Sequence, residues 1–240
     1  MKISSRKQVR NNAVLALAML AILGLAPGCQ ANSAGEGQED GMNATVKLPE
    51  PDREGDVSVE KALHQRRSVR SYSDEPLSLP QISQLLWAAQ GVTEPGRGLR
   101  TSPSAGATYP LETYLVVRRA SDLETGVYRY DPAAHALRQL SDKDQSRKLA
   151  AAALGQTSVS EAPVNVVLSA RYERTRRYGD KTERFVHMEA GHASQNLYLQ
   201  AEALNLATVV IGAFREERVR SLLGMPEEET PLYIQPVGRR

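Results

Sequence analysis

The sequence is poor in cysteine and in aromatic residues, and its charges nearly balance. Of 240 residues, one is Cys, two are Phe, one is Trp and nine are Tyr. A single cysteine excludes a disulfide framework within the chain. Few aromatic rings and a formal net charge of +2 argue against a surface that stacks bases or attracts phosphates, so no nucleic-acid partner is expected. The remaining composition, 41% hydrophobic and 24% charged, suffices for one sizeable core.

Signature motifs of several enzyme classes are also missing. His187 and His192 in "HMEAGH" are five residues apart, about 140° around a helix, whereas the zinc-protease motif needs a spacing of four. No metal site is therefore expected. "PSAGA" around Ser104 is not a nucleophile elbow, and no partner histidine for a serine hydrolase is indicated. "GRG" at 96–98 lacks the rest of a dinucleotide fingerprint, and no phosphate-binding G-K-[ST] motif occurs.

The only long hydrophobic run lies near the N-terminus, from Ala13 to Ala26, after four basic residues. It is short for a membrane span but suits a signal peptide. "LAPGC" follows and resembles a bacterial lipoprotein box, although Pro27 stands where Ala, Ser or Thr is usual. We predict a signal peptide at 1–29, lipidation at Cys29, and an exported protein held to the membrane by lipid alone, on the periplasmic side or the cell surface. An ordinary secretory signal, an uncleaved anchor and a cytoplasmic enzyme remain alternatives.

The rest of the chain divides into a linker and one domain. Residues 30–55 are rich in Gly, Asn, Glu and Ala without periodicity, which predicts a flexible linker before a domain at 56–240. Apolar residues at helical spacing predict helices at 58–68, 78–91, 141–155, 181–205 and 215–224. Apolar runs predict strands at 111–119, 127–130, 135–140, 162–170, 207–214 and 230–240. This interleaving indicates an α+β fold with a mixed or antiparallel sheet flanked by helices.

Three separate segments carry the chemistry that remains. "RRSVR", residues 66–70, follows the first predicted helix, and "SPSAGATYP", residues 102–110, is a loop of small residues. "IGAF" and "PVGR" are strand ends that would meet if their strands pair. Arginines suit a phosphate, and small residues allow backbone to approach a flat ligand. Together with apolar residues at the ends of these strands, they predict a mononucleotide site.

The order of these segments resembles the nitroreductase family of FMN enzymes, in particular its SagB-type or thiazoline-oxidase-like dehydrogenase branch. The resemblance rests on "RRSVRSYSDEPLSLPQISQLLWAAQGV", "RTSPSAGATYPLETYLVV", "GVYRYDPAAHAL", "RRYGDKTERFVHMEAGHASQNLYLQAEAL", "VIGAF" and "PLYIQPVGR". These segments cover nearly everything after residue 56. The resemblance implies an α+β fold, a homodimer, and two FMN sites at the subunit interface.

The same resemblance implies roles for individual residues. The arginine-rich segment would hold FMN, with Arg66 and Ser68 on the phosphate side, Arg70 at the pyrimidine edge or ribityl chain, and Arg67 either on the ligand or in a surface salt bridge. The backbone at Gly212 and Ala213 would lie near flavin N5, and Arg239 would add a second phosphate contact. The small-residue loop would lie along the isoalloxazine ring, commonly from the neighbouring subunit, through Pro103, Ser104, Ala105 and Gly106.

One departure from the branch bears on the reaction. Azoline dehydrogenases of this branch use a Lys-Tyr pair for deprotonation, whereas this chain has Arg177 and Tyr178 at the similar position. Tyrosine can act as an acid or base, but arginine keeps its proton. We therefore expect an exported FMN-dependent oxidoreductase, transferring hydride through flavin N5 to or from a small or peptide substrate. The alternatives are a flavin-binding module without redox catalysis and an azoline dehydrogenase of peptide modification. A polar stripe at Glu189, His192, Gln195 and Asn196 is expected to brace loops.

Overall fold

The computed structural model describes residues 44–240, so Cys29 and the expected signal peptide lie outside the described residues. Between residues 44 and 240, no helix has both the length and the apolar character that a membrane crossing needs. Part of the expected linker is folded: Thr45–Lys47 forms strand β1, which pairs with β6, and Leu48 is buried in the core. Val46 and Leu48 supply the apolar contacts that attach this otherwise polar segment to the domain.

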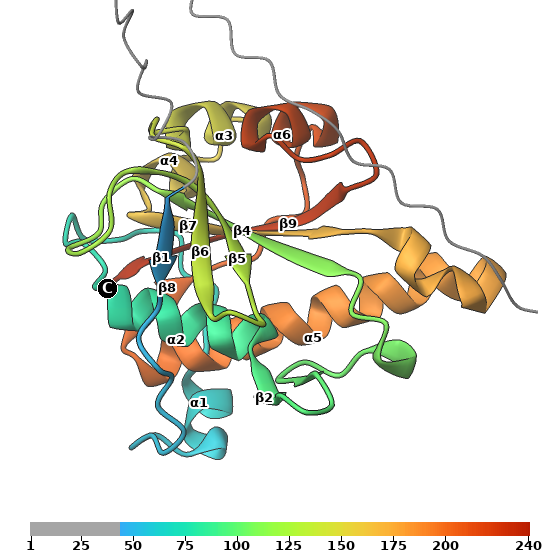
Figure 1. The fold of residues 1–240 in the computed structure, drawn as a ribbon. Helices are drawn as coiled ribbons and strands as arrows, with labels where there is room; N and C mark the ends of the chain where they lie inside the picture. Colours follow the sequence, from blue (N-terminus) through green and yellow to red (C-terminus); the bar gives the residue numbers. More distant parts are fainter. Residues whose placement is uncertain (1–43) are drawn as a thin grey trace, which may run out of the picture. The chain divides into compact units, whose positions relative to one another are not determined.

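A seven-stranded sheet forms the centre of the fold (Figure 1). Its order is β1-β6-β5-β4-β7-β9-β8, and every neighbouring pair is antiparallel. The remaining strands are β4 (Leu111–Val117), β5 (Gly126–Asp131), β6 (Ala136–Ser141), β7 (Val164–Ala170), β8 (Leu206–Thr208) and β9 (Thr230–Arg239). All seven residues of β7 are buried, because helices cover both faces of the central strands.

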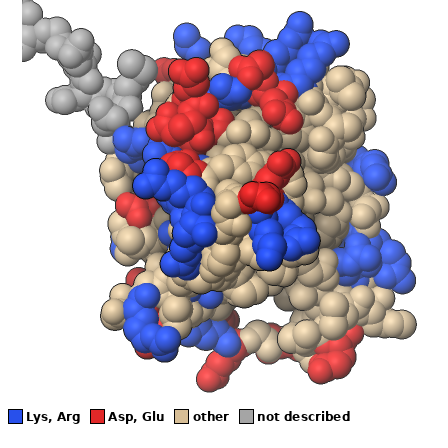
Figure 2. Space-filling view, turned by 90° about the vertical axis from the view of Figure 1, so that its right-hand side faces the viewer, with Lys and Arg blue, Asp and Glu red and all other residues tan. Residues whose placement is uncertain are grey.

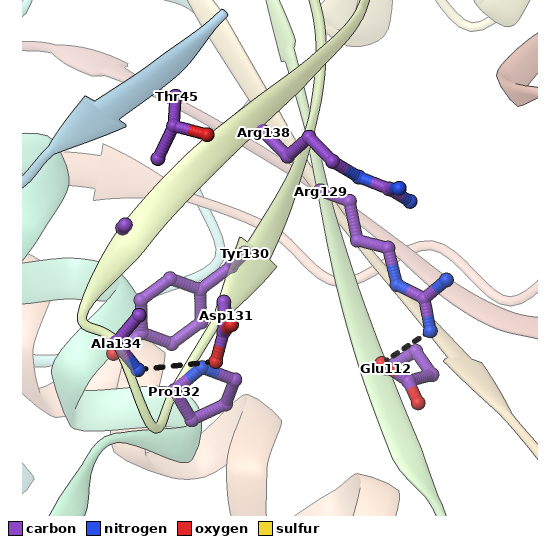
Figure 3. A pocket seen from close by; sticks show the side chains of 9 residues that line it. Thr45, Glu112, Arg129, Tyr130, Asp131, Pro132, Ala134 and Arg138 are labelled. Atoms are coloured by element: carbon purple, nitrogen blue, oxygen red, sulfur yellow. Dashed lines mark hydrogen bonds and ion pairs between the residues drawn. The ribbon is translucent and has the colours of Figure 1, made fainter. Parts of the chain in front are cut away.

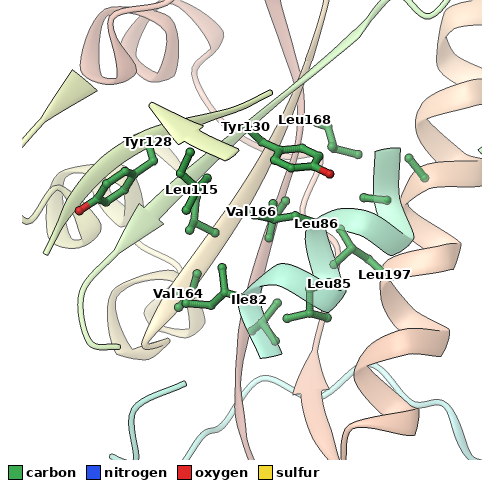
Figure 4. Close-up of a cluster of buried hydrophobic side chains, with 14 of the residues drawn as sticks. Ile82, Leu85, Leu86, Leu115, Tyr128, Tyr130, Val164, Val166, Leu168 and Leu197 are labelled. Atoms are coloured by element: carbon green, nitrogen blue, oxygen red, sulfur yellow. The ribbon is translucent and has the colours of Figure 1, made fainter. Parts of the chain in front are cut away.

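Helices α2 (Leu79–Gln90) and α5 (Thr182–Ala203) lie side by side on one face of the sheet (Figure 1). Ser78 begins α2 with a capping box, in which its side chain and that of Gln81 each bond the other's backbone N–H. The long helix α5 buries an apolar stripe at Val186, Ala190, Ala193, Leu197 and Ala201. Side chains from both helices pack against the sheet and form the main core (Figure 4).

A second helical layer covers part of the opposite face. It contains α3 (Ser146–Ala152), α4 (Thr157–Glu161) and α6 (Glu216–Leu223), grouped together in Figure 1. Strand residues alternate between the two layers: Leu115 faces the first core, whereas Tyr114 and Val116 face the second. The sheet therefore separates two hydrophobic cores, one on each face. The loops that connect its strands lie at its ends.

Several elements differ from the expectations. Helix α3 starts five residues later than expected because Ser141 completes β6, and the Asp144 carboxylate accepts the Ser146 N–H at 2.8 Å. Strand β8 ends at Thr208, and its continuation is a single bridge between Ile211 and Ile234. Helix α4 was not predicted, and neither was the ribbon formed by β2 (Val92–Glu94) and β3 (Leu99–Arg100). Short elements of this kind carry too few residues for a periodic signal.

Helix α1 (Val59–Gln65) precedes the arginine-rich segment. Ser58 caps it, as expected, by accepting the Lys61 N–H at 3.2 Å. Its residues Val59 and Leu63 are exposed, at 61% and 53%. Figure 2 shows the face of the molecule that lies at the right of Figure 1, where positive and negative side chains are interspersed.

Candidate functional site

The arginine segment (Arg66–Arg70) begins where α1 ends and runs along the edge of the sheet. Arg66 is the C-cap residue of α1. Ser68 forms a parallel bridge with Thr208 of β8, and the Val69 N–H donates to the Thr208 carbonyl at 2.9 Å. The segment is thus placed beside the last strand of the sheet, next to the chain that continues into Gly212.

Tyr198 of α5 connects this segment to the strand end, a role that sequence analysis did not identify. Its hydroxyl accepts the Val210 N–H at 2.8 Å and lies 3.0 Å from Ser68 Oγ. The Arg66 guanidinium carbon stands 5.1 Å from the centre of its ring, within cation–π range. A tyrosine on the buried face of a predicted helix could have indicated this role, because a buried tyrosine hydroxyl usually forms a hydrogen bond.

The arginines of the segment differ in how they are engaged. Arg67 donates to the carbonyls of His64 and Arg66, at 2.9 and 2.8 Å, and so caps the end of α1. Arg66 and Arg70 form no ion pair with any carboxylate in residues 44–240. Two guanidinium groups without carboxylate partners are a donor set that suits a bound anion.

The chain that follows β8 is open to solvent at Gly212 and Ala213. Gly212 and Ala213 are exposed, whereas Ile211 is held by two backbone hydrogen bonds to Ile234 at 2.8 and 3.0 Å. A Cβ added at Gly212 would meet only the Tyr233 ring, at 3.7 Å, which is ordinary van der Waals contact. Neither packing nor backbone conformation requires glycine at 212. Because glycine has no side chain, a ligand could approach the main chain closely from the solvent side.

Arg239 lies in β9, and its side chain contacts no residue of the arginine segment. Its guanidinium Nε is 3.4 Å from a Glu75 carboxylate oxygen, and it contacts Pro76 and Gln81 at the start of α2. None of these partners belongs to residues 66–70. The structure therefore gives Arg239 a position at the N-terminal end of α2 and does not bring its side chain to Arg66.

The small-residue loop (Ser102–Pro110) is tightly held and partly in a rare backbone conformation. Gly106, Ala107 and Tyr109 have φ values of 58°, 53° and 45°, in the left-handed region. Ser102 Oγ donates to the Ala89 carbonyl at 2.8 Å, which ties the loop to α2. Asn196 of α5 donates to Ser102 Oγ at 3.1 Å. The polar stripe of α5 thus braces this loop through Asn196.

Arg177 and Tyr178 lie against this loop, in the 3-10 helical segment Tyr172–Lys181. The Arg177 guanidinium donates to the Gly106 carbonyl, and its carbon lies 5.1 Å from the centre of the Tyr178 ring. Tyr178 packs edge-on against Phe185, with ring centres 5.0 Å apart. A Cβ at Gly106 would lie 1.7 Å from Arg177 Nη2 and 2.4 Å from the Tyr178 hydroxyl. The left-handed conformation therefore favours glycine at 106, and a Cβ there would displace the flexible end of Arg177.

Helix α5 separates the two groups of predicted site residues. Asn196 contacts the small-residue loop and Tyr198 contacts the arginine segment, and two residues correspond to about 200° around a helix. Among residues 44–240, no hydrogen bond or ion pair joins the loop group of Pro103, Ser104, Ala105 and Gly106 to the arginine segment. One chain alone does not bring the predicted residues into a single site.

A pocket on the exposed part of the sheet contains none of the predicted site residues (Figure 3). It encloses about 380 Å³ near the β5–β6 hairpin. At its base, Arg129 Nη2 lies 2.9 Å from Glu112 and 3.3 Å from Glu229. Glu229 is fully buried and also accepts from the Tyr114 hydroxyl at 2.7 Å. Burial raises the pKa of Tyr114, and the hydrogen bond to Glu229 raises it further. Glu229 also accepts from Ser169 and Arg171, at 3.0 Å each, so this cluster is a satisfied structural network.

Comparison with known proteins assigns the family. The nitroreductase family profile matches residues 63–239. A Methanocaldococcus jannaschii protein named as a nitroreductase is 46% identical over 83% of this chain and 99% of its own length. A crystal structure of a protein from Ralstonia eutropha, also described as a nitroreductase, has 31% identity and a TM-score of 0.70, covering 81% of this chain and 89% of that one.

Two more distant relatives carry names that state a function. An FMN reductase [NAD(P)H] of Bacillus subtilis is 25% identical over 75% of this chain and 63% of its own length. The microcin B17-processing protein of Escherichia coli is 27% identical over 68% of this chain and 62% of its own length. This chain therefore spans less than two thirds of either relative. The antiparallel sheet flanked by helices is the nitroreductase-like fold that the sequence predicts, and the chain belongs to the nitroreductase family of oxidoreductases.

Proposed function

We propose that this protein is an FMN-dependent oxidoreductase that transfers hydride to or from a small or peptide substrate. The observation that carries the proposal is the pair Arg66 and Arg70, which lack carboxylate partners in the described residues. Their segment is bridged to Thr208 of β8, the strand whose chain continues to the exposed Gly212 and Ala213. Family membership and the relative named as an FMN reductase support the cofactor. The donor set fits a flavin phosphate, because a phosphate needs several fixed cationic donors.

Bound FMN would supply the hydride-transfer chemistry, and the chain's own residues would bind and orient it. Arg66, held over Tyr198, and the Ser68 hydroxyl would bind the phosphate side. Arg70 would supply positive charge toward the pyrimidine edge or ribityl chain, where it favours the reduced, anionic ring. Gly212 and Ala213 would let main chain approach the ring without a side chain between them. Arg239, engaged with Glu75, would reach the phosphate only by leaving that partner.

The complete site would need a second copy of the chain. Helix α5 stands between the arginine segment and the small-residue loop, so a ligand on the arginines would meet the loop of another molecule. A homodimer satisfies this requirement, since each two-fold interface then contains two equivalent composite sites. The exposed apolar residues Val59 and Leu63 of α1 lie next to the arginine segment and offer surface for such an interface.

The branch within the family is a finer proposal. Similarity to the microcin B17-processing protein supports a relationship with the SagB-type branch. Against azoline dehydrogenation stands Arg177, which keeps its proton and donates to the Gly106 carbonyl. Tyr178 lies against the same loop and can act as an acid or base. We therefore favour an oxidoreductase that does not depend on a lysine base, with azoline dehydrogenation as the second candidate.

A bound flavin is the direct test. Full-length protein purified in mild detergent should carry FMN, detected by its yellow absorption and by release of free flavin on denaturation. Protein that remains colourless after incubation with FMN would contradict the proposal. Reduction with dithionite, followed by nitroaromatics, quinones, dioxygen or peptide azolines, separates an enzyme from a flavin-binding module. Reoxidation no faster than that of free FMN identifies the module.

Export and lipid anchoring at Cys29 complete the proposal. An exported enzyme has no access to cytoplasmic nicotinamide nucleotides, so dioxygen, a quinone or a redox protein would serve as its redox counterpart. Radioactive palmitate should label the wild-type protein but not the Cys29→Ala variant. Equal labelling of both, or no labelling of either, would contradict anchoring and would leave the flavin assignment intact.

A further inference from the structure

The chain that follows strand β7, residues 171–178, runs along the small-residue loop and forms a segment that we call the clasp. Strands β7 and β4 are antiparallel, with Ala170 opposite Leu111, so the chain after β7 continues beside the chain before β4. Each contact joins one clasp residue to one loop residue, in reverse order along the sequence. The contacts are the Arg171 N–H to the Pro110 carbonyl at 2.9 Å, Arg174 Nη1 to the Tyr109 carbonyl at 2.9 Å, the Thr175 and Thr108 hydroxyls at 3.0 Å, and Arg177 Nη2 to the Gly106 carbonyl.

Tyr109 has an unfavourable backbone conformation within this loop. Its φ is 45°, in the left-handed region, although it is not glycine and precedes Pro110, which favours an extended residue before it. Its N–H donates to Ser104 Oγ at 2.9 Å, its hydroxyl accepts the Arg100 N–H at 3.2 Å, and its carbonyl accepts from Arg174. A strained residue persists only where its surroundings determine its conformation, and such residues cluster at ligand-binding sites.

Arg174 connects Tyr109 to the central sheet. Its Nη1 donates to the Tyr109 carbonyl, and its Nη2 donates to the Glu112 carboxylate of β4. Glu112 is itself held in place, because its side chain is only 11% exposed and lies 2.9 Å from Arg129 Nη2. A guanidinium group presents its donors in one rigid plane, so it fixes the position of one acceptor relative to the other. The Tyr109 carbonyl is therefore positioned relative to β4.

The clasp leaves part of the loop open to solvent. Pro103, Gly106 and Ala107 are exposed, and none of the four clasp contacts involves Pro103 or Ala107. The exposed surface consists of small side chains and main chain, which a flat ligand can approach closely. Its shape depends on the backbone conformation that the clasp maintains.

We propose that Arg174 is a positioning residue, which together with Glu112 locks Tyr109 in its left-handed conformation and so fixes the surface that the small-residue loop offers to a ligand. The inference rests on the proposed function only for the identity of that ligand, a flavin ring held by a second copy and the electron acceptor that approaches the ring. Arg174 acts through the loop and does not contact the ligand.

Hydrogen exchange tests this lock without any ligand. In the full-length protein, a peptide that covers the loop contains the amides of Ala107 and Tyr109, which are both bonded to Ser104. These amides should exchange at least about tenfold faster in Arg174→Ala, the effect on local opening of losing one hydrogen bond to a charged group. Arg176→Ala is the matched control, because Arg176 is exposed and forms no ion pair within residues 44–240. Equal loop exchange in the two variants overturns the proposal.

Two further measurements separate a positioning role from general destabilisation. Amides of the fully buried strand β7 should exchange in Arg174→Ala as they do in wild type, since only the loop opens. Arg174→Lys keeps a positive charge beside Glu112 but lacks the planar group, so its loop should still exchange faster than that of wild type. Equal acceleration in the loop and in β7, or full restoration by lysine, contradicts the lock.

The effect on the ligand has a separate readout. In FMN-loaded protein reduced with dithionite, reoxidation by menadione should have a KM at least about tenfold higher in Arg174→Ala, because a displaced surface near the reacting atoms aligns the acceptor poorly. FMN affinity should change by less than about threefold, since the arginine segment binds the phosphate. An unchanged KM despite faster loop exchange refutes the positioning role and leaves the flavin assignment intact. If wild-type protein binds no flavin, the proposed function fails and the effect on the ligand with it, while hydrogen exchange still decides whether Arg174 locks the loop.

Discussion

The arginine segment and the small-residue loop are built in opposite ways. Arg66 and Arg70 have no carboxylate partner in residues 44–240, and the adjacent Gly212–Ala213 strand end is exposed. In the loop, Ser102 donates to the Ala89 carbonyl of α2 and accepts from Asn196 of α5. The Gly106 carbonyl already has a donor in Arg177. The difference indicates that the first region offers bonds to a ligand, whereas the second offers a rigid shape.

This contrast explains why each region needs the other. The arginines can bind the phosphate of a flavin, but they do not determine which residues cover its ring. A rigid loop of small residues can lie close to a ring but has little binding energy of its own. Because α5 separates the two regions within one chain, the proposed site would take its loop from a second copy.

The largest expected effect comes from removing the free donors. In the Arg66→Ala/Arg70→Ala double variant, FMN should bind at least about 100-fold more weakly, because each hydrogen bond to a charged group contributes about 1.5–3 kcal/mol. Arg67→Ala is the matched control, since Arg67 donates to α1 carbonyls. Fluorescence titration with FMN measures both. Equal losses for the double variant and for Arg67→Ala would remove the distinction between free and engaged arginines.

The buried carboxyl group of Glu189, on the helix that braces the loop, should appear in the pH dependence of stability, because burial raises its pKa to about 7. Glu189 binds a proton more tightly in the folded than in the unfolded chain, so its contribution is fully present below about pH 4.5 and is lost as pH rises to about 7. The shift corresponds to roughly 3 kcal/mol at most, since one unit equals about 1.36 kcal/mol. Urea unfolding at several pH values should show this loss in wild type and not in Glu189→Gln. Parallel curves for the two proteins would contradict it.

The rigid shape of the loop should depend on Gly106. Gly106→Ala places a Cβ at a left-handed φ and would displace the Arg177 guanidinium from the Gly106 carbonyl, so the free energy of unfolding should fall by about 2 kcal/mol. Gly224→Ala is the control, because Gly224 has a similar φ of 62° and open space around it. It should cost about 1 kcal/mol, the conformational part alone. Equal losses at the two glycines would show that the Arg177 contact contributes nothing.

A smaller effect is expected where α5 holds the arginine segment. Tyr198→Phe removes the hydroxyl that accepts the Val210 N–H and contacts Ser68. The free energy of unfolding should fall by about 1 kcal/mol, the usual net value of one hydrogen bond. FMN affinity should fall as well, since Ser68 loses its partner. Tyr172→Phe, which removes a hydroxyl contact with His187 near the surface, should change stability by less than about 0.5 kcal/mol.

Most of the fold could be predicted because its elements are long and periodic. The apolar stripe of α5 and the continuous apolar run of β7 gave clear signals, and the fully buried β7 confirms the second. Strand β1 was missed because three residues between polar neighbours show no period. Its folding depends on pairing with β6, a contact far away in the sequence. The late start of α3 has a similar cause, since Ser141 is used by the sheet.

The candidate site was harder to predict from the sequence. Motif order identified residues 66–70 and 102–110, and these remain the proposed site. The sequence did not reveal that Arg177 donates to the Gly106 carbonyl, or that Arg239 turns toward Glu75, because both depend on tertiary placement. Glu189 was interpreted as part of a bracing stripe. Its burial and its unpartnered oxygen are properties of the folded protein that no spacing rule contains.

The central claim is that each flavin site combines the arginine segment of one copy with the small-residue loop of another, and mixed dimers test it most directly. Arg66→Ala/Arg70→Ala removes the donors, and Ala105→Trp fills the loop surface. Neither variant alone should retain FMN. Dimers assembled from one chain of each, isolated through two different affinity tags, contain one intact composite site and should bind one flavin per pair of chains. Mixed dimers that stay free of flavin, although wild-type dimers bind it, would contradict the shared site.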